Sequence, residues 1–341
     1  MTNADDLMDK AVWLRPGAVT SVGSLPHLDA DEAAAFVLRR HPTIPAAPQL
    51  PARSHLEGMV AQAARGIQGV TVTRRGLELD LAALDPEAPV DPCLDGAGHA
   101  GLLAFLALVA GRTEPVKVQL TGPVTLGLAL IQAGAEPDLA FRVAASAVRT
   151  QAAALVELCR HRLPDAPLLA FLDEPGLTAL AGGIPLDVDA TTDLLSGALA
   201  TLEPHATSGV HCCGPTDWRL VSAAGPTVIS MPATAETVLA GATAIGQHLE
   251  RDGWVAWGAV PTHEPLGTDV DRLWRRLTAL WCELVKVGCD PVQLRAQAIV
   301  SPACGLAGHG VSQASRSLLL ASVIADRVSD QAIAARLSMG A

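Results

Sequence analysis

Short apolar segments recur along the chain, with amphipathic or alanine-rich stretches between them. Most of these segments are runs of Val, Ile, Leu and Ala without strict alternation of apolar and polar residues. Such runs are typical of parallel strands that are buried on both faces. Eight strands are predicted in this way, at 19–24, 43–50, 116–121, 167–173, 208–213, 226–231, 254–260 and 297–302.

The stretches between the strands show the spacing of apolar residues that helices require. Eight strands that alternate with helices over roughly 300 residues predict an α/β fold, a (β/α)8 TIM barrel. We expect one domain over 1–341, with its core at about 18–328. A doubly wound open sheet, which has fewer strands, is the alternative. The clearest predicted helices are 29–40, 139–162, 189–202, 236–251, 269–286 and 313–327.

Residues 66–96 do not fit the repeating strand and helix unit. Residues 69–75 alternate like one strand of a hairpin, and residues 85–92 are a loop rich in proline and acidic residues. We therefore expect a β-hairpin excursion after the second strand.

Composition excludes some classes of function. The net charge is −11, which disfavours binding to a nucleic-acid backbone. The longest apolar run, 100–111, is too short to span a bilayer. The first residues are acidic and lack the layout of a signal peptide. We expect a cytoplasmic protein with no nucleic-acid or membrane partner. Because disulfides are disfavoured in that compartment, its seven cysteines are expected to be free thiols or metal ligands.

Chemistry in such a barrel gathers at the carboxyl ends of the strands. His211 and Cys213 end the fifth predicted strand, and Cys304 follows the last one. Residues two apart in a strand face the same side, so His211 and Cys213 point together and Cys212 points away. One imidazole and two thiolates predict a zinc site with an open position, as in catalytic zinc. The alternative is a set of small buried thiols beside a hydrogen-bonded histidine.

Two adjacent carboxylates, Asp173 and Glu174, end the fourth predicted strand before Pro175. Successive side chains face opposite ways, so one of them, with Asp173 preferred, is expected to point into the barrel mouth. There it would hold a substrate ammonium group or act as a base. The alternative is an acid that stabilises the N-terminus of the helical turn that follows it in the chain.

Two weaker candidates complete the predicted site. The end of the first strand, with Ser21, Gly23 and Ser24, offers backbone N–H groups to a small carboxylate. His263, in the loop after the seventh strand, is a candidate general acid. The alternative for His263 is an ordinary surface histidine.

Several of these motifs together resemble a known family. Val-Gly-Ser, Leu-Thr-Gly-Pro, Asp-Glu-Pro, His-x-Cys and Pro-x-Cys-Gly-Leu resemble the catalytic barrel of cobalamin-independent methionine synthase. The wider superfamily also holds uroporphyrinogen decarboxylase and methylcobamide:thiol methyltransferases. The match extends from about Thr20 to Ala307 and is closest to short, single-barrel members. The motifs lie at 22–24, 120–123, 173–175, 211–213 and 302–306.

The resemblance assigns roles to individual residues. It makes His211, Cys213 and Cys304 zinc ligands. It makes the segment 21–24 and Asp173 contacts to the amino-acid part of homocysteine. It also makes His263 a candidate proton donor.

The sequence departs from the family pattern in two ways. The glutamate that often follows strand six is absent, since the chain reads Val-Ile-Ser-Met-Pro at 228–232, and Glu236 lies four residues beyond. The chain also has the length of one barrel where the long methionine synthases have two. A methyl-corrinoid, free or bound to a protein, is therefore as plausible a methyl donor as methyltetrahydrofolate.

The expected activity is zinc-dependent transfer of a methyl group to a thiol, with homocysteine as the preferred candidate. A free thiol has a pKa of about 8.5 and is mostly protonated at neutral pH, whereas a zinc-bound thiol is deprotonated. Two thiolates and a neutral imidazole cancel the charge of zinc, so an added substrate thiolate keeps its electron density. One alternative is a decarboxylase of the uroporphyrinogen type, which needs several arginines at strand ends, and the nearest are Arg53, Arg74 and Arg75. Another is a zinc-binding protein without catalysis.

Overall fold

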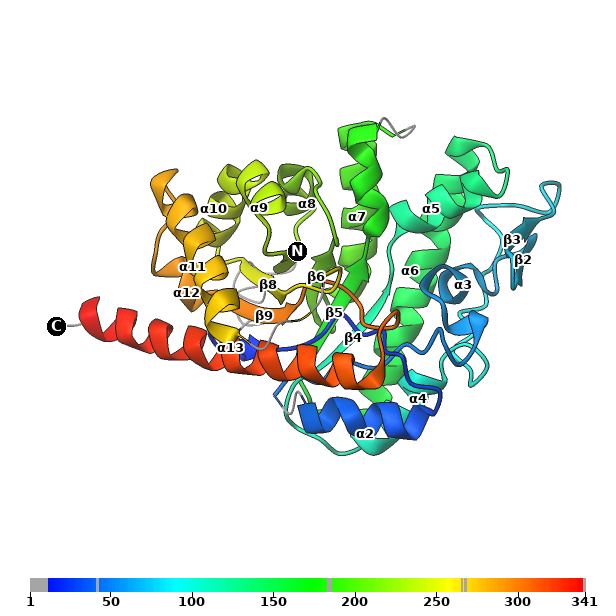
Figure 1. The fold of residues 1–341 in the computed structure, drawn as a ribbon. Coiled ribbons are helices and arrows are strands. Elements are labelled where there is room, and N and C mark those ends of the chain that lie inside the picture. Colours follow the sequence, from blue (N-terminus) through cyan, green and yellow to red (C-terminus); the bar gives the residue numbers. More distant parts are fainter. Residues whose placement is uncertain (1–11, 41–42, 183–185, 265, 267–268, 340–341) are drawn as a thin grey trace.

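Seven parallel strands form a curled sheet at the centre of the molecule (Figure 1). The structure, a computed structural model, describes residues 12–40, 43–182, 186–264, 266 and 269–339. The strands are β1 (Ala18–Val19), β4 (Val116–Thr121), β5 (Leu168–Asp173), β6 (Thr207–His211), β7 (Val228–Pro232), β8 (Trp254–Val260) and β9 (Ala298–Pro302).

The strand order decides between the two predicted architectures. The sheet runs β1-β9-β8-β7-β6-β5-β4, so each strand from β4 to β9 lies beside the next in the chain. The first strand, β1, pairs with the last, β9. A doubly wound sheet places its first strand in the interior, with later strands on both sides. The observed order therefore excludes that alternative and supports the curled α/β sheet.

The predicted second strand, 43–50, does not form a regular strand among the described residues. Two isolated parallel bridges, Ser24 with Gln49 and Ala46 with Lys117, place this segment between the two edges of the sheet. Pro45 and Pro48 lack the N–H groups that a continuous ladder needs. The α/β class with a seven-stranded parallel sheet is thus established, and a complete eight-stranded barrel stays a prediction.

Helices cover the outer face of the sheet (Figure 1). Short 3-10 turns occur at η2 (His55–Glu57) and η3 (Pro175–Gly182). The α-helices are α2 (Ala30–Arg40), α3 (Met59–Ala64), α4 (Ala100–Leu108), α5 (Pro123–Gln132), α6 (Pro137–Arg162), α7 (Val188–Leu202), α8 (Trp218–Ala223), α9 (Ala235–Ala240), α10 (Ala242–Glu250), α11 (Val270–Lys286), α12 (Gln293–Ala296) and α13 (Val311–Met339).

Two predicted helices differ from the observed ones. The predicted helix 236–251 is divided into α9 and α10 at Gly241, where a Cβ atom would lie 2.5 Å from the Trp218 ring. The last helix extends beyond the predicted range 313–327 and ends at Met339, because no Gly or Pro interrupts it before Gly340.

The strands are buried on both faces, as the apolar runs predict. One core, which includes Leu172, Val210 and Ile229, packs between the sheet and the helices. A second core, which includes Phe171 and Trp254, fills the concave side of the sheet. Polar side chains replace apolar ones on this concave side toward the carboxyl ends of the strands, and that is where the site forms.

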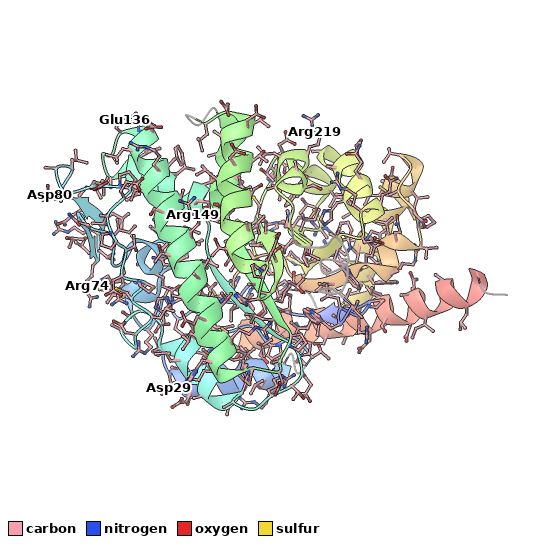
Figure 2. The ribbon with its side chains drawn as sticks, turned by 180° about the vertical axis from the view of Figure 1, so that it is seen from behind. Asp29, Arg74, Asp80, Glu136, Arg149 and Arg219 are labelled. Atoms are coloured by element: carbon pink, nitrogen blue, oxygen red, sulfur yellow. The ribbon has the colours of Figure 1, made fainter. Side chains whose placement is uncertain are left out.

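The predicted hairpin is present. Strands β2 (Val70–Thr73) and β3 (Gly76–Leu79) pair antiparallel, with Thr73 opposite Gly76. Arg74 and Asp80 lie at the outer edge of the molecule in Figure 2. The hairpin is therefore a peripheral addition to the sheet-and-helix core.

One helix among the described residues, α6, is long and apolar enough to cross a membrane by length and composition alone. However, 61% of its most apolar window is buried inside the protein. Burial of this kind is typical of a core helix of a globular protein.

Candidate functional site

A cavity of about 330 Å³ opens where β5, β6 and β9 end, and we call it the site cavity. Five of the predicted site residues line it, and they come from four separate segments of the chain. Gln49, Glu57 and Met59 line it as well. The predicted residues in its wall are Ser24, Asp173, His211, Cys213 and Cys304.

The His211 ring is held in one orientation. It ends β6, its side chain is buried, and its Nδ1 lies 2.9 Å from Ser230 Oγ on β7. Its Nε2 is buried and has no hydrogen-bond partner among the described residues. An imidazole that is fixed through one nitrogen and free at the other has the arrangement of a metal ligand.

The two candidate thiol ligands interact with each other. A hydrogen bond between Cys213 and Cys304 lowers the pKa of Cys213, and with burial it raises the pKa of Cys304 to about 12. The nearby His211 ring opposes this rise by lowering the pKa of Cys304. Cys212, in contrast, is fully buried outside the site cavity, as the alternation along the strand predicts.

The donor set fits zinc, although the side chains are not already arranged around an ion. Among the residues that the structure describes, no three His, Cys, Asp or Glu side chains stand in a geometry that could hold a metal. The thiols of Cys213 and Cys304 instead form a hydrogen bond with each other. Two sulfurs and one unpartnered imidazole nitrogen facing one cavity are nevertheless the ligand types of a three-residue zinc site. Zinc binding at these residues stays a prediction.

Asp173 is the acidic group of the site cavity that lacks a hydrogen-bond partner. It ends β5, it is 5% exposed, and its Oδ1 makes no hydrogen bond within the described residues. Burial raises its pKa to about 7, and the positive charge of Lys117 opposes that rise. An unpartnered carboxylate oxygen in a cavity wall is suited to receive an ammonium or hydroxyl donor.

Glu174 points away from the site cavity and caps a helix. Its Oε1 accepts a hydrogen bond from Val124 N at 2.8 Å, and its Oε2 accepts one from Thr125 N at 2.7 Å. The Thr125 hydroxyl donates to Oε2 as well, at 2.5 Å. These groups form the first turn of α5, so Glu174 stabilises the N-terminus of a helix that precedes it in the chain, and not the turn that follows it.

We expect Glu174→Ala to destabilise the protein by about 3 kcal/mol, because three buried donors lose their acceptor. Urea unfolding of the variant measures this. Glu174→Gln retains one acceptor oxygen and is expected to lose less stability. Equal stability of wild type and Glu174→Ala would contradict the capping role.

The end of the first predicted strand forms part of the cavity wall through Ser24. Gly23 has φ +135, which side-chain-bearing residues rarely adopt, and a Cβ atom there would collide with the Gln119 amide. Ser21 is buried, and its hydroxyl has no partner among the described residues. Of the three predicted residues of this segment, only Ser24 lines the cavity.

His263 lies apart from these residues. It is exposed in the loop after β8, and it does not line the site cavity. The adjacent Glu264 pairs with Arg276 at 3.0 Å. The role of His263 as a proton donor stays a prediction.

Strand β7, where the resembled family often has a glutamate, places Ser230 beside His211. Ser230 is the hydrogen-bond partner of His211, whereas Glu236 is exposed at the start of α9 and is not part of the cavity wall. The absent glutamate is therefore not replaced by an acid from this strand.

Sequence reasoning did not find Lys117, Gln49 or Glu57. Lys117 and Gln119 alternate with Val118 and Leu120 in a fully buried strand, and that alternation was a usable signal. Gln49 and Glu57 lie in irregular segments, where no pattern shows which way a side chain points.

Comparison with solved structures supports the fold. The chain is similar to a methyltransferase from Methanosarcina mazei, with 16% identity, coverage of 94% of this chain and 96% of that chain, and a TM-score of 0.61. It is also similar to a proposed vitamin-B12-independent methionine synthase from Listeria monocytogenes, with 12% identity, coverage of 92% and 98%, and a TM-score of 0.59. No protein-family model matches the sequence, and no curated protein matches it closely. At these identities the likeness establishes the fold alone.

Proposed function

We propose that this protein is a zinc-dependent methyltransferase that acts on a thiol, with homocysteine as the first candidate acceptor and methionine as the product. The observation that carries the proposal is the meeting of His211, Cys213, Cys304 and Asp173 in one cavity wall. The two solved structures of similar fold are described as a methyltransferase and a proposed methionine synthase, which agrees with this chemistry.

We also infer that the chain belongs to the superfamily of cobalamin-independent methionine synthase and that residues 43–50 complete an eight-stranded barrel. The support for closure is the pair of bridges that join this segment to Ser24 on one side and Lys117 on the other. A backbone hydrogen bond accompanies each bridge: Leu25 N donates to Gln49 O at 2.9 Å, and Ala47 N donates to Lys117 O at 2.8 Å.

Three side chains would hold the metal: His211 through Nε2, and Cys213 and Cys304 through their sulfurs. A bound zinc ion would supply a position at which the acceptor thiol is deprotonated and held as a nucleophile. Ser230 keeps the imidazole aligned through Nδ1, as an outer partner of a metal ligand does. The hydrogen bond between the two thiols would have to break before both sulfurs could bind the ion.

Asp173 is placed to orient the acceptor. Its free Oδ1 would accept hydrogen bonds from the ammonium group of homocysteine, while the wall at Ser24 faces the carboxylate. Holding the acceptor at two points fixes its sulfur relative to an incoming methyl group and reduces the entropic cost of in-line transfer. The donor is a methyl-corrinoid, free or carried by a partner protein, or methyltetrahydrofolate.

The composition of the cavity wall disfavours the decarboxylase alternative. Among the described residues that line the site cavity, none is Lys or Arg, whereas a substrate with many carboxylates needs several. Arg53 pairs with Glu57 at 2.9 Å, and Arg74 and Arg75 lie at the turn of the β2-β3 hairpin.

Methyl transfer tests the proposal directly. Zinc-loaded protein is incubated with homocysteine and either labelled methylcobalamin or labelled methyltetrahydrofolate, and we expect labelled methionine from one of them. Denatured protein and protein without homocysteine are the controls. Absence of transfer from both donors, with zinc shown to be bound, would overturn the proposal and leave a zinc-binding protein without this activity.

A further inference from the structure

Lys117 is a buried cation beneath the site cavity. It lies on β4 on the same face as Gln119, and its exposed fraction is 3%. Removing an ammonium group from water costs several kcal/mol unless a negative charge and hydrogen bonds compensate for it. A lysine inside the sheet, where Leu or Val would pack without this cost, therefore requires an explanation.

The hydrogen bonds of Lys117 reach the predicted substrate segment. Its Nζ donates to Val22 O at 2.8 Å and to Gln119 Oε1 at 3.1 Å, and it lies 4.8 Å from the centre of the Phe171 ring. The bond to Val22 holds the strand-one turn directly before Gly23 and Ser24. The two oxygens accept hydrogen bonds from two of the three N–H groups of the ammonium but carry no negative charge to balance it.

Asp173 is the acidic group that lies on the same side of the sheet as Lys117. Phe171 and Asp173 share one face of β5, and their partners on β4 are Gln119 and Thr121. Lys117 thus lies deeper in the sheet than Asp173, and the electrostatic attraction between the two acts through the protein interior. No other carboxylate is found to act on Lys117 among the described residues.

We propose that Lys117 is a positioning residue for the acceptor site: it holds the Val22–Ser24 turn from below and supplies the buried counter-charge that keeps the Asp173 carboxylate available to an acceptor ammonium group. The part that concerns the acceptor rests on the proposed function. The electrostatic link between Lys117 and Asp173 does not.

A double-mutant cycle in urea unfolding tests that link without any assay of activity. The variants are K117M, D173N and K117M/D173N, where each single change leaves one charge buried without its counter-charge. We expect the unfolding midpoint of the double variant to lie above the value obtained by adding the two single shifts. Additive shifts would overturn the proposal. If K117M alone does not fold, recovery of folding in the double variant supports the link, and failure to recover contradicts it.

Acceptor kinetics test the positioning role. Homocysteine is compared with 4-mercaptobutyrate, which lacks only the ammonium group. We expect K117M to raise the KM for homocysteine about tenfold or more, to change kcat less, and to raise the KM for 4-mercaptobutyrate by a smaller factor, because both thiols share the carboxylate at the Val22–Ser24 turn and only homocysteine has the ammonium group. Equal losses with both thiols overturn the role of Lys117 at the ammonium group. Absence of turnover in the wild type defeats the proposed function instead, and the unfolding cycle still decides the link.

Discussion

Replacement of Cys304 by alanine is expected to abolish stable zinc binding and methyl transfer together. The change removes one of the three predicted ligands and leaves His211 and Cys213 alone in the cavity wall. Loss of an outer hydrogen-bond partner typically lowers metal affinity roughly 10–100-fold, so loss of a ligand should lower it by more than about 100-fold. Zinc content after dialysis against a chelator, measured by atomic emission, checks this.

Cys282→Ala provides the matched control, because that thiol is exposed on α11 and lies outside the site cavity. The control is expected to retain zinc and activity at wild-type levels. Should Cys304→Ala bind zinc as tightly as the control, the three-ligand site is wrong and the thiols are simply packed neighbours.

Asp173→Asn is expected to lower kcat/KM for homocysteine by about 30- to 1000-fold, while zinc remains bound. The substitution replaces a charged acceptor by a neutral amide opposite the substrate ammonium, and loss of such a buried charged partner costs about 2–4 kcal/mol. With 4-mercaptobutyrate, which has no ammonium group, the loss is expected to be small. Steady-state kinetics with both thiols measure the difference.

Asp138→Asn is the surface control for this experiment. Asp138 pairs with Arg142 on α6, its side chain is 76% exposed, and it lies outside the site cavity. Its substitution is expected to leave both kinetic constants unchanged. An equal loss of activity with the two thiols in Asp173→Asn would mean that Asp173 acts on something other than the ammonium group.

The sequence was sufficient to predict the positions of the strands that are buried on both faces. The apolar run of β8 predicted that strand to the residue, because apolar side chains on both faces are stable only in the interior of a covered sheet. The bounds of β4 were predicted equally well, although Lys117 and Gln119 alternate with its apolar residues. The segment 43–50 shows the limit of that reasoning. Its apolar residues are buried as expected, yet its prolines restrict it to isolated bridges.

The site was predictable where a residue's direction follows from strand alternation. His211 and Cys213 face the cavity and Cys212 does not, as residues two apart require. Glu174 also obeys this alternation, but the sequence does not show that the start of α5 lies beside it to take up its oxygens. The position of His263 depends on a loop, whose path no periodic pattern specifies.

The segment 43–50 is paired with its neighbours differently from the strands that carry the predicted site residues. Strands β5, β6 and β9, which lead to Asp173, His211 and Cys304, are each hydrogen-bonded on two sides. Gln49 belongs instead to a stretch that is joined to its neighbours by isolated bridges and not by a continuous ladder. Under the proposed function, this stretch is the part of the cavity wall that would adjust to a corrinoid or pterin ring, while β5, β6 and β9 would hold the predicted zinc ligands in place.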